Sequence, residues 1–256
     1  LDLSEATSLV EIGDSAFSST DLGGTLVIPA KLTTIGPSAF DSTLLTGLDL
    51  SEATSLVEIG DSAFYGTGLA GTLVIPAKLA TIGPFAFDST LLTGLDLSEA
   101  TSLVEIGDGA FSVTGLEGRL VIPAKLMTIG PYAFDNTKLT GLDLSEATSL
   151  VEIGNSAFFA TGLEGTLVIP AKLTKIGPQA FQYTKLTGLD LSKAASLVEI
   201  VDGAFFATGL EGTLVIPAEL AKIGPYAFDN TKLTGLDLSE ATSLVEIGDS
   251  AFSSTD

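Results

Sequence analysis

The chain has 256 residues, of which 45% are hydrophobic, and its 32 acidic and 11 basic residues give a net charge of -21. This charge repels phosphate backbones and anionic headgroups, so we do not expect nucleic acid as a partner. The absence of Cys and His excludes disulfides, thiolate or imidazole metal ligands, and hydrolysis that depends on a histidine base. No apolar run reaches 18 residues, and membrane insertion is therefore not expected.

A 47-residue repeat organises the whole sequence. The phrase "LDLS" recurs at this constant step and begins at Leu1, Leu48, Leu95, Leu142, Leu189 and Leu236. Because repetition at a fixed step is typical of solenoids, we expect one domain over residues 1–256. Its copies cover residues 1–47, 48–94, 95–141, 142–188, 189–235 and, in part, 236–256.

Each copy divides into a long coil and a short coil that share one frame. In the first copy these are Leu1–Thr25 and Leu26–Gly47, and two of the three additional residues of the long coil lie in "SEATSL". The alternation in "LDL" and "LVI" predicts a short strand with one buried face. A Pro follows this strand in every short coil and should end it. We therefore predict an α/β-type repeat solenoid, mostly β and irregular coil, with about eleven coils on one parallel sheet.

The second half of every coil carries the frame Ile-Gly-x-x-Ala-Phe, typified by "IGDSAF" and "IGPSAF" and with Val201 as its one lapse, followed by a Thr three residues beyond the Phe. This pattern resembles the BspA-like leucine-rich repeats, and the resemblance covers the entire chain. It implies a leucine-rich-repeat fold, an extracellular or cell-surface location and a role linked to adhesion. The family often has Cys where this chain has Thr, so no disulfides support the extracellular location.

Three columns of this phrase are expected to face the interior. The Ile and Phe columns, from Ile12 and Phe17 to Ile247 and Phe252, should form the apolar core. The Thr column should also be buried, with its hydroxyls bonding the backbone of successive coils. A regular external array of these Thr is the less favoured alternative.

No catalytic, cofactor or metal site is predicted. The stretch "GTGLAG" at residues 66–71 matches a dinucleotide-binding motif, but it leads into a strand, whereas that motif needs a strand before it and a helix after it. A calcium site needs six to eight converging oxygens, and one Asp in every second coil does not provide them. We therefore expect neither an enzyme nor a cofactor.

An acidic stripe occupies the outward strand position. Asp residues of the long coils alternate there with Val residues of the short coils, so we expect a solvated acidic face. The alternative is a cation-bridged or partner-binding strip with Asp49, Asp96, Asp143 and Asp190 as contacts. In a second column, Lys175 and Lys222 fall between Glu residues of adjacent coils and predict cross-coil charge pairs.

Additional aromatic residues appear close to the "AF" phrase in most middle coils. Two interpretations stay open: an exposed contact surface, or an aromatic ladder stacked along the solenoid. The residues are Tyr65, Phe85, Tyr132, Phe159, Tyr183, Phe206 and Tyr226.

The last 21 residues repeat the first 21. This identity suggests a segment of a longer array, or a unit that stacks end to end. The sequence favours a structural scaffold that self-associates into a surface fibre. Alternatives are an adhesion module that binds a protein or glycan through its strand face, and a consensus-designed repeat protein.

Overall fold

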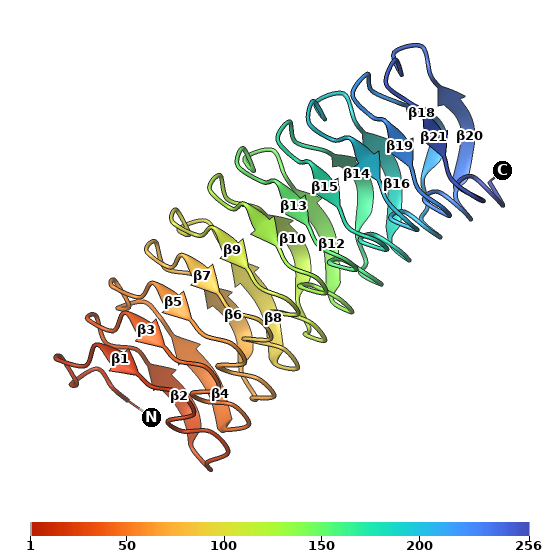
Figure 1. Ribbon diagram of the computed structural model, residues 1–256. Helices are drawn as coiled ribbons and strands as arrows, with labels where there is room; N and C mark the ends of the chain where they lie inside the picture. The colour runs from red at the N-terminus through yellow and green to blue at the C-terminus, as the bar shows by residue number, and fades with distance from the viewer. Residues whose placement is uncertain (1, 256) are drawn as a thin grey trace.

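The computed structural model describes residues 2–255 and shows a rod of stacked coils with the two ends of the chain at opposite ends of the rod (Figure 1). Leu1, expected to face the interior, lies outside the described residues. Residues 2–255 contain no helix, so the solenoid is built from strands and turns alone. The predicted solenoid of about eleven coils is confirmed.

The Ile column forms a single parallel sheet along the rod. Each strand has two residues, and each Ile pairs with the Ile of the next coil, as in Ile12↔Ile35. The continuous sheet therefore follows the Ile column, whereas the sequence placed it at the "LDL" and "LVI" segments. Its eleven strands are β1 (Glu11–Ile12), β3 (Thr34–Ile35), β5 (Glu58–Ile59), β7 (Thr81–Ile82), β9 (Glu105–Ile106), β11 (Thr128–Ile129), β13 (Glu152–Ile153), β15 (Lys175–Ile176), β17 (Glu199–Ile200), β19 (Lys222–Ile223) and β21 (Glu246–Ile247).

The "LDL" and "LVI" segments pair in twos on another side of the rod. Val27 pairs with Asp49 in the first pair, and the register shifts between Gly24 and Thr25, where Gly24 has a φ of +77°. Gly adopts this positive φ without strain, and the conformation allows the β-bulge that shifts the register. The pairs are β2 (Gly23–Val27) with β4 (Leu44–Asp49), β6 (Ala70–Val74) with β8 (Leu91–Asp96), β10 (Glu117–Val121) with β12 (Lys138–Asp143), β14 (Glu164–Val168) with β16 (Lys185–Asp190), and β18 (Glu211–Val215) with β20 (Lys232–Asp237).

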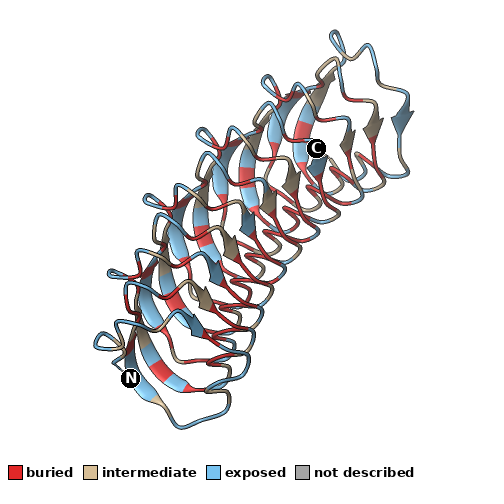
Figure 2. Cartoon of the chain, turned by 60° about the vertical axis from the view of Figure 1, so that its left-hand side comes forward, coloured by how far each residue is buried: buried red, intermediate tan, exposed pale blue. Residues whose placement is uncertain are grey.

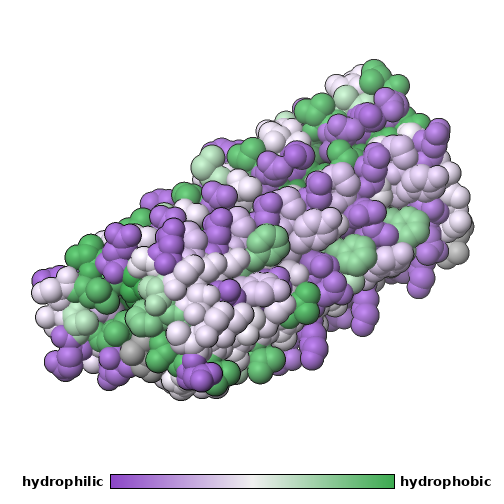
Figure 3. Space-filling view, turned by 60° about the horizontal axis from the view of Figure 1, so that its bottom comes forward, coloured by the Kyte–Doolittle hydropathy of each residue, from purple (hydrophilic) through white to green (hydrophobic). Residues whose placement is uncertain are grey.

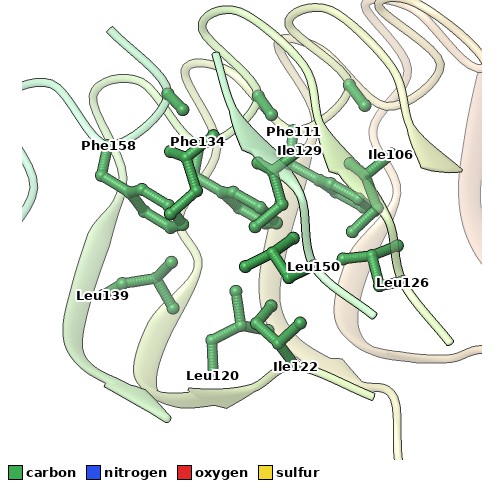
Figure 4. Packing of buried hydrophobic residues seen from close by; sticks show 14 of the residues in the cluster. Ile106, Phe111, Leu120, Ile122, Leu126, Ile129, Phe134, Leu139, Leu150 and Phe158 are labelled. Carbon is green, nitrogen blue, oxygen red and sulfur yellow. The ribbon is translucent and has the colours of Figure 1, made fainter. Parts of the chain in front are cut away.

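A ladder of eleven Phe rings runs through the core. Rings of successive coils stack with centroids 5.1 to 5.5 Å apart and interplanar angles of 2° to 10°, and Figure 4 shows Phe111, Phe134 and Phe158 in this arrangement. The spacing is close to the separation of strands in a sheet. The Ile and Phe columns are therefore core as predicted, apart from the end coils, where Phe17 and Phe252 are partly buried and Ile247 is 47% exposed.

The turn after each Ile carries two left-handed residues in every coil. They are the residue before "AF" and the second residue after it, and where they are not Gly their φ lies between 51° and 62°. Between them, N–H groups bond carbonyls of the next coil, as from Phe17 to Ala39 at 2.8 Å. This side of the rod is thus fixed by backbone bonds without strands, and Figure 2 shows a continuous buried band along it.

The Thr column lies inside, with nine of its members buried. Its hydroxyls do not bond the next coil as expected. Each bonded Oγ1 donates to the carbonyl of the Phe three residues earlier in its own coil, as from Thr43 to Phe40 at 2.9 Å. The hydroxyl thus caps the turn within its own coil, because the backbone N–H and C=O groups of neighbouring coils already bond one another.

Candidate functional site

Three equivalent grooves lie on the face formed by the paired strands. We name them groove 2, groove 3 and groove 4 after the copy that supplies their long coil, and their volumes are about 570, 700 and 520 Å³. Each is lined by the "LDLS" and "AT" residues of a long coil, by the "PAK" segment of the following short coil, and by the third residue after the Asp of the next long coil.

The grooves join apolar surface with hydroxyl groups. In groove 4, Leu142, Val168 and Pro170 lie beside Ser145 and Thr148. Because equivalent residues recur every 47 positions, the same chemistry is repeated along the rod. A smaller cavity of about 200 Å³ occupies the corresponding place in copy 1 and is lined by Ser4, Thr7, Ile28, Pro29, Ala30, Lys31 and Glu52.

The Asp stripe ends the strands of the long coils. Asp49 Oδ1 accepts a hydrogen bond from the Ser51 N–H at 2.9 Å, and this bond holds the pKa of Asp49 below its ordinary value. The same turn recurs at Asp2, Asp96, Asp143, Asp190 and Asp237. These carboxylates stay ionised while they shape the strand ends.

The structure places the Asp candidates differently with respect to the grooves. Asp49, Asp96 and Asp143 line groove 2, groove 3 and groove 4 respectively, whereas Asp190 lines none of the three. No group of three acidic side chains that could hold a metal ion occurs among residues 2–255. The same part of the chain has no helix long and apolar enough to cross a bilayer.

The predicted cross-coil charge pairs are confirmed. Lys175 Nζ lies 2.6 Å from Glu152, and Lys222 Nζ lies 3.3 Å from Glu199 and 3.5 Å from Glu246. The bond to Glu199 raises the pKa of Lys222. All these side chains are well exposed, so each pair adds little to stability.

The aromatic candidates divide into a cluster and a set of separate side chains. Tyr183 contacts Phe159 and Phe206 edge to face, with ring centroids 5.4 and 5.8 Å apart. Tyr65, Phe85, Tyr132 and Tyr226 are between 40% and 51% exposed and have no ring stacked on another aromatic within residues 2–255. The continuous ladder proposed for these residues is therefore limited to three rings. On the face of the rod that Figure 3 shows, hydrophobic side chains lie among hydrophilic ones.

Four of these aromatics hold an unusual backbone conformation. Phe85, Tyr132, Tyr183 and Tyr226 have φ between 55° and 62°, a region that bulky residues rarely adopt. Most other coils have Ser, Gly, Asn or Ala at the same two positions. The chain thus carries exposed rings at sites where small residues fit with less strain.

Sequence reasoning did not identify the grooves or one cavity on the turn side. That cavity has a volume of about 430 Å³ and is lined by Pro178, Gln179, Gln182, Asp202, Gly203, Phe206 and Tyr226. Gln182 is buried, and its Oε1 has no hydrogen-bond partner. The available signal was the replacement of the Asp of other short coils by Gln182.

Parallel coils of two lengths around an Ile, Leu and Phe core define a leucine-rich-repeat solenoid. The family model for the BspA type leucine rich repeat region, which spans six copies, matches residues 10–140 and 104–234. The chain therefore belongs to the BspA-type leucine-rich-repeat family, as the resemblance implied.

Solved structures share this fold at low sequence identity. A leucine-rich repeat protein from Bacteroides ovatus is 20% identical with a TM-score of 0.52, over 96% of this chain and 80% of that one. The pneumococcal vaccine antigen PcpA is 19% identical with a TM-score of 0.52, over 96% and 74%. The functional domain of InlJ from Listeria monocytogenes, which includes a cysteine ladder, is 18% identical with a TM-score of 0.54, over 100% and 56%. A search of curated proteins finds no significant match.

Proposed function

We propose that this chain is a non-catalytic recognition module, displayed outside the cell, that binds an extended protein or glycan along its strand face. The observation that carries the proposal is the recurrence of groove 2, groove 3 and groove 4 at the 47-residue step. Equivalent sites on one rigid scaffold engage a repetitive ligand several times, and this multiplies a weak affinity. Family membership and the likeness to a vaccine antigen support an extracellular location.

The grooves have the chemistry that a binding site requires. Their apolar lining, such as Leu48, Val74 and Pro76 in groove 2, offers contact area, while Ser and Thr hydroxyls fix orientation. The Asp turns at the strand ends hold this lining in a constant geometry. Preorganisation of this kind lowers the entropic cost of binding.

Blocking the grooves tests this function. Ala77, Ala124 and Ala171 are exposed and line groove 2, groove 3 and groove 4, so a triple substitution to Trp should fill all three without disturbing the core. We would compare this variant with the wild type on an array of immobilised glycans and extracellular-matrix proteins. Binding that the triple variant loses and that Glu105→Trp, on the Ile sheet, retains would support the proposal. Equal binding by all three proteins would overturn it.

A second candidate function is self-association along the turn side. It rests on the exposed aromatics Phe85, Tyr132, Tyr183 and Tyr226, which the chain keeps at strained positions. Strain that persists without a local gain favours a functional role. Sedimentation velocity should show association that weakens in Tyr132→Ser with Tyr226→Ser, because Ser156 and Ser250 occupy the same position in other coils. A wild type that stays monomeric at high concentration would remove this candidate.

A further inference from the structure

We propose that groove 4 is an anion-recognising subsite that takes a carboxylate-bearing sugar residue of an acidic glycan. The inference rests on the proposed recognition function and names the ligand class of one groove. It follows from the charges of the grooves, since their apolar linings are alike.

The three grooves differ in charge. Groove 2 has the charged residues Asp49, Lys78 and Glu99, so carboxylates outnumber cations. The charged residues of groove 3 are Asp96, Arg119, Lys125 and Glu146, which balance. Those of groove 4 are Asp143, Arg119, Lys172 and Lys193, which are three cations against one carboxylate. The chain as a whole has a net charge of -21. Groove 4 is the only one of the three grooves in which cationic side chains outnumber carboxylates.

The single carboxylate of groove 4 is already neutralised. Arg119 donates to Asp143 with 2.6 Å between the nitrogen and Oδ2. Lys172 and Lys193 form no ion pair within 4.0 Å in the described part of the chain. The charge of Lys193 also helps to lower the pKa of Asp190. Two ammonium groups thus face a groove whose other polar groups are the hydroxyls of Ser145, Thr148 and Thr166.

Two departures from the repeat create this charge. Arg119 stands where the other four short coils have Thr, and Lys193 stands where the other long coils have Glu. They are far apart in the sequence, yet both line groove 4. Substitutions scattered at random over a near-identical array would not be expected to meet in one cavity.

The lining favours a sugar over a peptide. β12 and β14, which border groove 4, belong to different strand pairs and are not hydrogen-bonded to each other. Side chains line the groove between them and suit a sugar acid: hydroxyls for a sugar ring, apolar surface from Leu142 and Val168 for its face, and ammonium groups for a carboxylate.

Calorimetry with an oligogalacturonide and its methyl ester tests the inference. The ester keeps the sugar and removes the charge, so we expect the acid to bind at least about tenfold more tightly, with a strong dependence on salt. Lys193→Glu with Arg119→Thr restores the residues of other copies and should abolish this preference. Lys232→Glu, which is remote from groove 4, should retain it.

A transfer experiment gives a gain of function. Thr25→Arg with Glu99→Lys places the two cations at the equivalent positions of groove 2. The number of oligogalacturonide molecules bound per chain should rise from one to two. Equal affinity for acid and ester, or binding unaffected by the groove 4 variant, would overturn the inference; so would tighter binding of a short poly-glutamate peptide than of the oligogalacturonide. None of these results contradicts recognition by the other grooves, which the Trp variants test separately.

Discussion

At the scale of single residues, the Asp stripe combines a structural role with a surface charge. Each carboxylate accepts the N–H of the second residue after it, as Asp49 does from Ser51. The bond lowers the pKa of Asp49 and of Asp96, because a hydrogen bond to the charged form favours that form. The acidic face is thus a consequence of how the long coils end their strands.

Replacing Asp49 and Asp96 by Asn should make the protein less sensitive to acid. A carboxyl whose pKa is lowered by folding stabilises the folded state at neutral pH, and this contribution is lost as the pH falls from the ordinary carboxyl pKa through the lowered one. Asn keeps the acceptor oxygen but does not titrate. We therefore expect a modest loss of stability at pH 7 and a shallower loss between about pH 5 and pH 2.

Urea unfolding across this pH range checks the expectation. Burial raises the pKa of Asp88 and Asp135, whose protonation favours the folded state in acid, so the variant must be compared with the wild type at each pH. Glu117→Gln, at an exposed carboxylate that makes no hydrogen bond in the structure, serves as the control. If the stability of the Asn variant depended on pH in the same way as that of the wild type, the Asp turns would not contribute to the acid sensitivity of folding.

A second residue-scale feature is the pairing of Phe85 with Gly109 in the next coil. A Cβ at Gly109 would lie 2.6 Å from the Phe85 ring. Gly109→Ser should therefore cost about 1–3 kcal/mol in the wild type through overpacking. The cost should be smaller in the Phe85→Ser background, where only the positive φ of Gly109 remains unfavourable.

A double-mutant cycle of unfolding free energies measures this coupling. Gly203→Ser is the matched control, because the nearest atom there, Gln179 Cγ, lies 3.6 Å from the Cβ position. Additive effects of the Phe85 and Gly109 substitutions would mean that the ring does not cover the glycine in solution.

At the scale of elements, each coil from the second onward lies against the backbone of the preceding coil at the Gly after its Ile. A Cβ at Gly154 would lie 2.4 Å from the Pro131 nitrogen, so the column needs glycine for contact between backbones. Val201 is the one departure. Gly154 donates its N–H to Ile129 at 2.8 Å, but the Val201 N–H makes no such bond to Ile176.

This difference predicts a locally weak junction before residues 198–201. The N–H groups of Val151, Glu152 and Gly154 bond the preceding coil, whereas those of Val198, Glu199 and Val201 have no such bond within 3.5 Å, although β17 keeps its register with β15. Hydrogen exchange should be about tenfold faster or more in residues 198–201 than in residues 151–154. Val201→Gly should slow it, and equal exchange in the two segments of the wild type would contradict the prediction.

At the scale of the whole molecule, the repeat made much of the fold predictable. A fixed step places equivalent residues above one another, so the Ile and Phe core, the alternation of Asp and Val, and the Lys–Glu pairs all follow from the sequence. The position of the continuous sheet did not follow, because "LDL" and "LVI" look like strands in every coil. Whether they pair in a continuous ladder or in twos depends on the bulge at Gly24 and its equivalents.

The candidate site was less predictable than the fold. The Asp and aromatic residues could be placed on the surface by period alone, and the structure shows which of them line a groove. Each groove is lined by residues of a long coil, the following short coil and the next long coil. The sequence of one copy alone therefore does not show the groove. Arg119 and Lys193 are visible as departures in the sequence, but only the stacking of coils shows that they meet.

All coils stack at constant spacing along one rod with a shared interior. The absence of Cys allows pairs of spin labels to be introduced at the equivalent exposed positions Ser51, Ser145 and Ser239. At about 4.8 Å per coil, pulsed electron paramagnetic resonance should give about 19 Å between residues 51 and 145 and about 38 Å between residues 51 and 239. Distances that do not grow in proportion to the number of coils would contradict the claim, because they would show a chain folded into separate globules.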